Sequence, residues 1–165
     1  EQATFALGMR RYGLPKHLHM LARSQFDLAG LFDFNRLPEC VGGQPRRPDI
    51  PFPAVYPEAN WPQAWSASAL ALIVQSMLGL YPFAPLQTLI LDPDLPEWFP
   101  ELTIRKLRVG EAQVDLHVER DADGETDFEV LDRRGQLHVV HQPSPWSLRA
   151  TFAERARDLV RSLTK

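Results

Sequence analysis

Cysteine is almost missing from this sequence, since Cys40 is the only one in 165 residues. A single cysteine cannot form an internal disulfide, which favours a reducing compartment, and we therefore expect a cytoplasmic protein. No apolar run reaches the ~18 residues that a membrane helix needs. The first residues also lack the basic and apolar regions of a signal peptide. We expect no contact with a membrane.

A large excess of charge is missing as well. The chain has 18 Lys and Arg against 21 Asp and Glu, a formal net charge of −3, and it has no basic stripe. This balance argues against a nucleic-acid partner. With 44% hydrophobic and 24% charged residues, the composition is close to the globular average and allows a sizeable core.

The common catalytic and metal-binding motifs are also missing. The sequence contains no GxGxxG, no P-loop and no GxSxG. His17 and His19 are two residues apart on an expected helix and so point to different faces, and no histidine stands at a zinc spacing from Cys40. We expect neither a metal nor a cofactor.

Helical periodicity fills the first half of the chain. It predicts one helix at roughly 3–12, a second from Pro15 to about Leu31, and a third at about 63–79. A proline-rich loop at 33–60 separates the last two. Since apolar residues cover nearly every face of 63–79, we expect that helix to be buried all round.

From Leu86 the pattern changes to alternation. Val114, Leu116 and Val118 alternate with polar residues, and turns at Asp123-Gly124 and Arg134-Gly135 follow. This predicts a small antiparallel sheet over 86–142. Residues 144–165 read as an amphipathic C-terminal helix. The sequence therefore predicts an α+β chain with a helical part (1–82), a β-subdomain (86–142) and a last helix (144–165).

The long loop concentrates side chains suited to sugar binding. Flat aromatic rings offer faces for the C–H surfaces of pyranoses, and carboxylates and amides bind hydroxyl groups. The candidates are Arg36, Glu39, Tyr56, Trp61, Gln63 and Trp65. The alternative is structural: Trp61 and Trp65, four residues apart, could form one face at a helix start that packs into the core.

Four motifs in order carry a family resemblance: "GMRRYGL" at 8–14, "RLPE" with a glycine pair at 36–43, "YPEANWPQAWSASAL" at 56–70, and "LDPDLPEWFPELTIRKLRVGEAQVDL" at 91–116. Together they resemble the C-terminal part of bacterial amylo-α-1,6-glucosidase-type proteins. These are glycogen-debranching-like members of the six-hairpin (α/α)₆ glycosidases. The resemblance covers nearly all the chain up to about Val118.

The resemblance implies a fold and roles. The helices would be the last hairpins of an (α/α)₆ barrel, with a small β-domain after them. Glu39 would be the general base, Arg36 would orient it, and Gln63 and Trp65 would lie beside the sugar. The partner acid is absent from this chain and is expected upstream of it.

Three functions follow as hypotheses. The chain is the C-terminal fragment of a glycoside hydrolase acting on α-linked glucosides, inactive alone; or a non-catalytic carbohydrate-binding or protein-interaction module; or a purely structural domain. In the first case the helices would lack their barrel neighbours, and we expect the fragment to self-associate.

Overall fold

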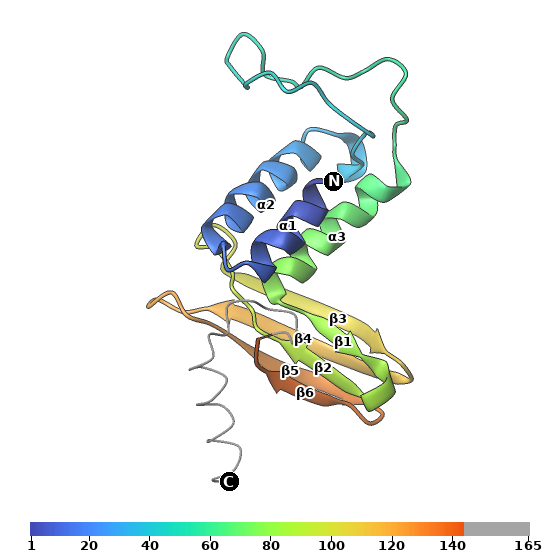
Figure 1. The fold of residues 1–165 in the computed structure, drawn as a ribbon, viewed down its shortest axis with the longest axis vertical. Helices are drawn as coiled ribbons and strands as arrows, with labels where there is room; N and C mark the ends of the chain where they lie inside the picture. Colours follow the sequence, from blue (N-terminus) through green and yellow to red (C-terminus); the bar gives the residue numbers. More distant parts are fainter. Residues whose placement is uncertain (144–165) are drawn as a thin grey trace.

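The computed structural model describes residues 1–143, with three helices on one side of the molecule and two sheets on the other (Figure 1). The helices are α1 (Gln2–Arg11), α2 (Pro15–Ala29) and α3 (Ala64–Leu78), with 3₁₀ turns η1 (Asp33–Asn35) and η2 (Ala84–Leu86). The strands are β1 (Tyr81–Phe83), β2 (Thr88–Leu91), β3 (Glu101–Val109), β4 (Ala112–Arg120), β5 (Thr126–Arg134) and β6 (His138–His141).

Local sequence explains where the helices begin and end. Pro15 stands at the first turn of α2, where its missing N–H has no helical partner to lose. Gly79 ends α3 in the left-handed region, at φ 54°, where glycine is favoured. The three helices pack on one core of apolar side chains: Ala3, Ala6, Leu18, Ala22, Ile73 and Met77.

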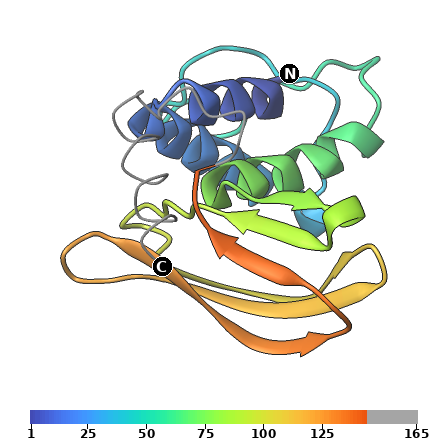
Figure 2. The same ribbon diagram turned by 60° about the horizontal axis from the view of Figure 1, so that its bottom comes forward.

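The six strands form two sheets that face each other (Figure 2). In the first, β2 pairs antiparallel with β1 and parallel with β6. In the second, β4 lies between β3 and β5, antiparallel to both. The core between the sheets joins apolar residues of β2, such as Leu89, to the buried face of β4 around Leu116. The predicted alternation along β4 is therefore confirmed.

The prediction that the helices form the last hairpins of an (α/α)₆ barrel is wrong. An (α/α)₆ barrel would leave the apolar faces of these helices to further hairpins, but α3 packs against both α1 and α2 and closes their common core. The C-terminal end of α3 then enters the core between the sheets through Leu78. The chain is α+β, but its helices form one layer that is completed by the sheets.

The prediction of a single antiparallel sheet over 86–142 is also wrong. The region 86–142 is divided between two sheets, and β6 runs parallel to β2 with His141 opposite Leu91. Parallel pairing needs a long connection, and here β3, β4 and β5 supply it by forming a sheet of their own.

All-round burial of α3 holds only for its second half. Ile73, Ser76, Met77 and Leu78 are buried, but the first turns face solvent and Trp65 is 73% exposed. The predicted C-terminal helix at 144–165 lies outside the described residues. None of the helices within residues 1–143 has the length and apolar character needed to cross a bilayer.

A polar cluster joins the helices to the sheets. Arg10, near the end of α1, donates to the backbone and the carboxylate of Asp92, directly after β2. Nε2 of His19 on α2 lies 2.9 Å from the carbonyl oxygen of Asp94. The Arg10 side chain is only 10% exposed. These contacts fasten α1 and α2 to the segment that follows β2.

Candidate functional site

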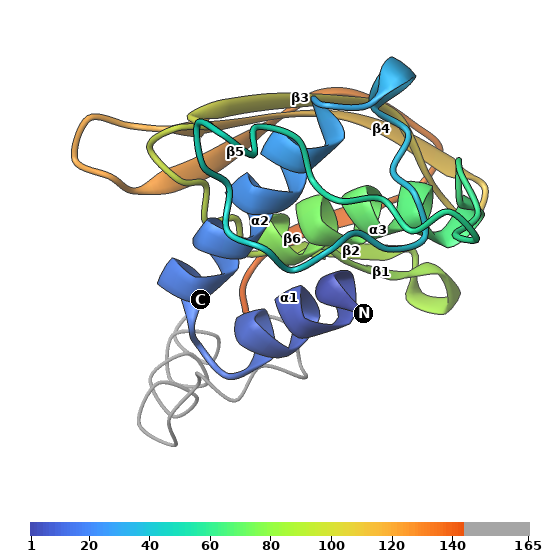
Figure 3. The ribbon, with the colours of Figure 1, turned by 90° about the horizontal axis from the view of Figure 1, so that it is seen from above.

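The long loop between α2 and α3 closes on itself across its two arms. The backbone N–H of Gly42 donates to the carbonyl oxygen of Ala54 at 2.6 Å, beside an antiparallel bridge between Val41 and Val55. Figure 3 shows the two arms crossing the ends of the helices. Since backbone bonds tie the arms together, the side chains at the loop base are held in register.

Glu39 and Asn60 form the tie nearest the helices. The backbone N–H and the side-chain Nδ2 of Asn60 both donate to Oε2 of Glu39, each at 3.2 Å. The backbone N–H of Glu39 donates in return to the carbonyl oxygen of Asn60 at 2.9 Å. The carboxylate predicted to be a general base therefore holds the loop closed, and it remains exposed to solvent.

Three aromatic rings form a surface beside this tie, which we call the aromatic platform: Phe32, Phe52 and Trp61. The ring of buried Phe32 lies 5.3 Å from that of Phe52 and 5.7 Å from that of Trp61, measured between centroids. The indole N–H of Trp61 donates to the carbonyl oxygen of Arg36 at 2.9 Å. Trp61 is nevertheless 55% exposed and Phe52 is 47% exposed. The platform thus presents two oriented rings to solvent.

Arg36 does not orient Glu39 as predicted. Its guanidinium lies over the ring of Phe34, 5.6 Å from the centroid, and within residues 1–143 it makes no ion pair with Glu39. Phe34 itself is 87% exposed and has a left-handed backbone, at φ 56°. The contribution of Arg36 to the loop base is its carbonyl oxygen, which accepts from Trp61.

Gln63 has a structural role at the start of α3. Its side-chain Oε1 accepts from the backbone N–H of Ala64 at 3.1 Å, and its own N–H donates to the carbonyl oxygen of Leu37 at 3.1 Å. The hydroxyl of Ser66 donates to the carbonyl oxygen of Pro38 at 2.9 Å. The bond to Ala64 gives an acceptor to the helix start, where the first N–H groups have no helical acceptor. The bonds to Leu37 and Pro38 fasten the helix start to the loop base.

Tyr56 and Trp65 are exposed and stand apart from the platform contacts. Tyr56 lies on the returning arm of the loop, and Trp65 lies on the first turn of α3. Since Trp61 and Trp65 are both more than half exposed, the structural alternative, in which they form a core face, is wrong. The structure brings together Glu39, Trp61 and the backbone of Arg36, and it does not bring Tyr56 or Trp65 into the same contacts.

The sequence analysis passed over one residue of this surface, Phe32. It noted Phe52 and Asn60 as an aromatic ring and an amide of the loop but gave neither a role at the site. Phe32 follows the apolar stripe of α2, which could have indicated that a buried ring anchors the loop. Asn60 directly precedes Trp61, but nothing in its position indicates that it binds a glutamate 21 residues away. Such partners depend on how the loop folds back.

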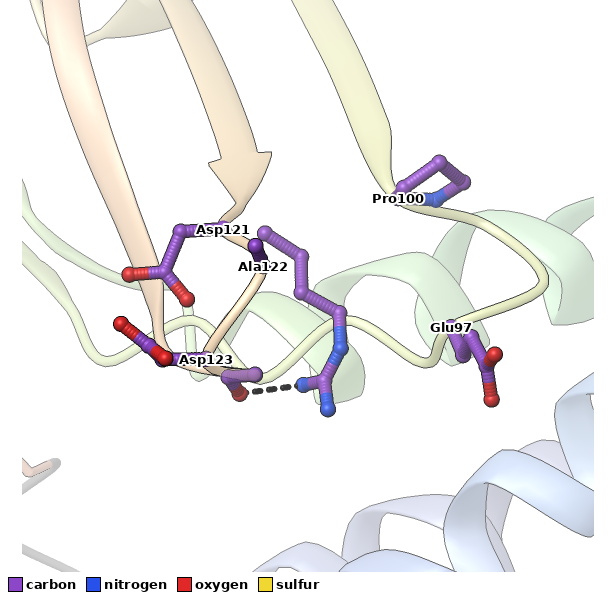
Figure 4. Close-up of a pocket in the computed structure, with 7 residues that line it drawn as sticks. Glu97, Pro100, Asp121, Ala122 and Asp123 are labelled. Atoms are coloured by element: carbon purple, nitrogen blue, oxygen red, sulfur yellow. Dashed lines mark hydrogen bonds between the residues drawn. The ribbon is translucent and has the colours of Figure 1, made fainter.

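A concavity lies at the turn between β4 and β5, apart from the long loop. It has a volume of about 340 Å³ and is lined by Glu97, Pro100, Arg120, Asp121, Ala122, Asp123 and Gly124. Figure 4 shows side chains that line this concavity, with a hydrogen bond between them drawn as a dashed line. Nη1 of Arg120 donates to the carbonyl oxygens of Leu95, at 3.0 Å, and Gly124, at 2.5 Å. The arginine fastens the turn to the segment before β3.

The described part of the chain contains no cluster of metal-binding side chains. Among residues 1–143, no three His, Cys, Asp or Glu side chains come together as a set that could hold an ion. Comparison with known proteins adds no assignment, since no protein-family model, no curated protein and no solved structure matches the chain significantly.

Proposed function

We propose that the chain is a carbohydrate-recognition module, which binds sugar on the aromatic platform of its long loop. The observation that carries this proposal is the state of Trp61. Its ring packs on buried Phe32 and its N–H is bonded to Arg36, yet more than half of its surface faces solvent. An aromatic ring already held in place loses little conformational freedom when a ligand stacks on it.

Polar groups at the border of the platform supply the second part of sugar recognition. Glu39 and Asn60 lie next to Trp61, and both bonds that Glu39 accepts fall on Oε2. Within residues 1–143, Oε1 of Glu39 has no bonded partner and can accept from a hydroxyl group. A pyranose needs this combination, because its C–H face is apolar and its rim carries hydroxyl groups.

Binding is better supported than hydrolysis. An inverting glycosidase needs two carboxyl groups about 6.5–9.5 Å apart, one acting as acid and one as base. Glu39 is engaged in closing the loop, and the predicted acid belongs to a barrel whose helix arrangement this chain does not have. The hydrolase role remains a prediction that depends on an acid from outside these residues.

A cytoplasmic location belongs to the same proposal. Cys40 is exposed and unpaired in the loop, and a reducing compartment would keep such a thiol from forming disulfides between molecules.

The test is calorimetric titration of the chain with a linear α-linked glucose oligosaccharide. Trp61→Ala should weaken binding by at least about fivefold, since a stacked ring contributes about 1 kcal/mol beyond its buried area. Tyr12→Ala is the matched control, because Tyr12 is 65% exposed and stands at the end of α1 near the sheets. Equal loss in both variants, or no binding by the native chain, would contradict the proposal.

Two further measurements separate binding from catalysis and from misfolding. Release of reducing sugar by the native chain, at a rate that Glu39→Gln abolishes, would show that the chain hydrolyses glucosides by itself and that the expectation of an inactive fragment is wrong. The urea unfolding midpoint of Trp61→Phe should lie closer to that of the native chain than the midpoint of Trp61→Ala does, if the ring's packing on Phe32 is retained. Trp61→Phe should then keep more affinity than Trp61→Ala.

A further inference from the structure

We propose that two copies of the chain pair through β5, so that their β3–β4–β5 sheets join into one continuous sheet. β5 is nine residues long and is the outer strand of its sheet, hydrogen-bonded to β4 on one side only. Among residues 1–143 no strand pairs with its other side. An open edge of this length presents backbone donors and acceptors to another strand.

The other outer strands are less suitable. On β3, the register shifts between Ile104 and Leu107, and Lys106 has a left-handed backbone at φ 58°. The backbone N–H of Lys106 is already bonded to Oδ1 of Asp115, at 2.6 Å. β6 has only four residues and β1 has three. A bulge, a positive charge and a short length are the usual protections of a sheet edge. β5 also has one extra residue, at Leu131, and two arginines at its end, but it has no left-handed residue and is longer than β1 and β6.

Exposed apolar residues mark the middle of β5. Val130 is 37% exposed and Leu131 is 48% exposed, although apolar residues on a strand edge normally pack against something. An antiparallel copy whose two-fold axis passes between these two residues would place each Val130 opposite the partner's Leu131. The exposed apolar surface of each copy would then be covered by the same surface of the other copy.

The charges along β5 favour a second copy in this orientation. Its first half carries Asp127 and Glu129 and its last residues are Arg133 and Arg134. Antiparallel pairing places the acidic half of one copy beside the basic end of the other, and parallel pairing would place like charges together. In the alignment above, Asp127 stands opposite the partner's Arg134, and opposite charges on facing strands stabilise a sheet.

A local irregularity brings these two residues to one face. Asp127 is paired with Glu119 and Arg134 with Gln113, both on the outward face of β4. Seven positions along a regular strand would put them on opposite faces. At Leu131, β5 has one extra residue between Val130 and Asp132. This register shift places Asp127 and Arg134 on the same face of the sheet. The same alignment sets Glu129 opposite Asp132, a like-charge pair that keeps the dimer weak.

The test uses charge reversal in the full chain, measured by sedimentation velocity over a range of concentrations. The native chain should dimerise, and Asp127→Arg or Arg134→Glu alone should weaken the dimer by about tenfold, because each replaces two attractive pairs with two repulsive ones. An equimolar mixture of the two variants should restore association, since both pairs in the mixed dimer are again attractive. Glu129→Lys should strengthen the dimer by removing the like-charge pair.

Arg47→Glu and Asp49→Arg are the matched control pair. These residues form an exposed ion pair in the long loop, with 3.1 Å between their charged atoms, so the same charge changes are made away from β5. Neither control should alter association, and their mixture should show no restoration. The proposal is overturned if the native chain stays monomeric, as it would if its own residues 144–165 covered β5. It is equally overturned if the mixture of β5 variants associates no better than either alone.

Discussion

Glu39 and Asn60 stand 21 positions apart in the sequence and hold the two arms of the long loop together through three hydrogen bonds. Two of these bonds end on one carboxylate oxygen, and the third joins the two backbones. The neighbouring Trp61 owes its orientation to this closure, since its N–H reaches the carbonyl oxygen of Arg36 on the opposite arm. The loop needs its length because it runs out and folds back as two arms that bond to each other.

Removing the Glu39 carboxylate should loosen the loop without unfolding the molecule. Glu39→Ala loses both bonds from Asn60 and should lower the free energy of unfolding by about 1 kcal/mol, a modest loss because the site is exposed. Glu39→Gln keeps an acceptor oxygen and should lose less. The sensitive measurement is trypsin cleavage after Arg36, where Leu37 is buried in the native loop.

Glu58→Ala is the control for this experiment, because Glu58 lies on the same loop and has no hydrogen-bond partner within residues 1–143. Cleavage after Arg36 should be faster in Glu39→Ala than in Glu58→Ala. Equal rates would mean that the tie to Asn60 does not hold the loop closed.

Removing the Arg10 side chain should lower the free energy of unfolding more than removing an exposed charged side chain does. Arg10→Ala leaves the partly buried Asp92 carboxylate without its partner, and breaking such a pair costs about 3 kcal/mol. Lysine should restore only part of this, since it has a single charged nitrogen, whereas Arg10 places Nη2 on Asp92 and Nη1 4.0 Å from the Asp94 carboxylate. Urea unfolding of Arg10→Ala, Arg10→Lys and the exposed control Arg11→Ala would measure the difference. An Arg10→Ala variant as stable as Arg11→Ala would contradict the prediction.

Gly79 should tolerate no side chain. Its φ of 54° alone costs an alanine roughly 1–2 kcal/mol. A Cβ there would also lie 2.7 Å from the backbone oxygen of Asp92 and 2.7 Å from Nη2 of Arg10. We expect Gly79→Ala to lower the thermal midpoint clearly. Gly8→Ala in α1 is the opposite control, since its Cβ would meet open space and alanine favours a helix by about 0.5–1 kcal/mol. Similar midpoints for the two variants would refute the close approach at Gly79.

The sequence alone was enough to place the helices and one strand. Proline at the start of α2, glycine after α3 and the alternation along β4 act through the chain's own backbone and side-chain directions, so their consequences are local. Exposure at the loop base was less predictable. Trp61 and Trp65 have the spacing of a core face, but whether such a face is covered depends on which other segment reaches it.

Tertiary structure decided which surfaces meet. An apolar stripe shows that a helix has a face to bury, but it does not identify the segment that covers it, and here α3 and the sheets take the place of the expected barrel hairpins. The parallel pairing of β2 with β6 joins residues about 50 positions apart, and strand patterns carry no record of a partner so distant. The role of Glu39 was decided in the same way: its carboxylate was visible in the sequence, and only the fold brought Asn60 to it.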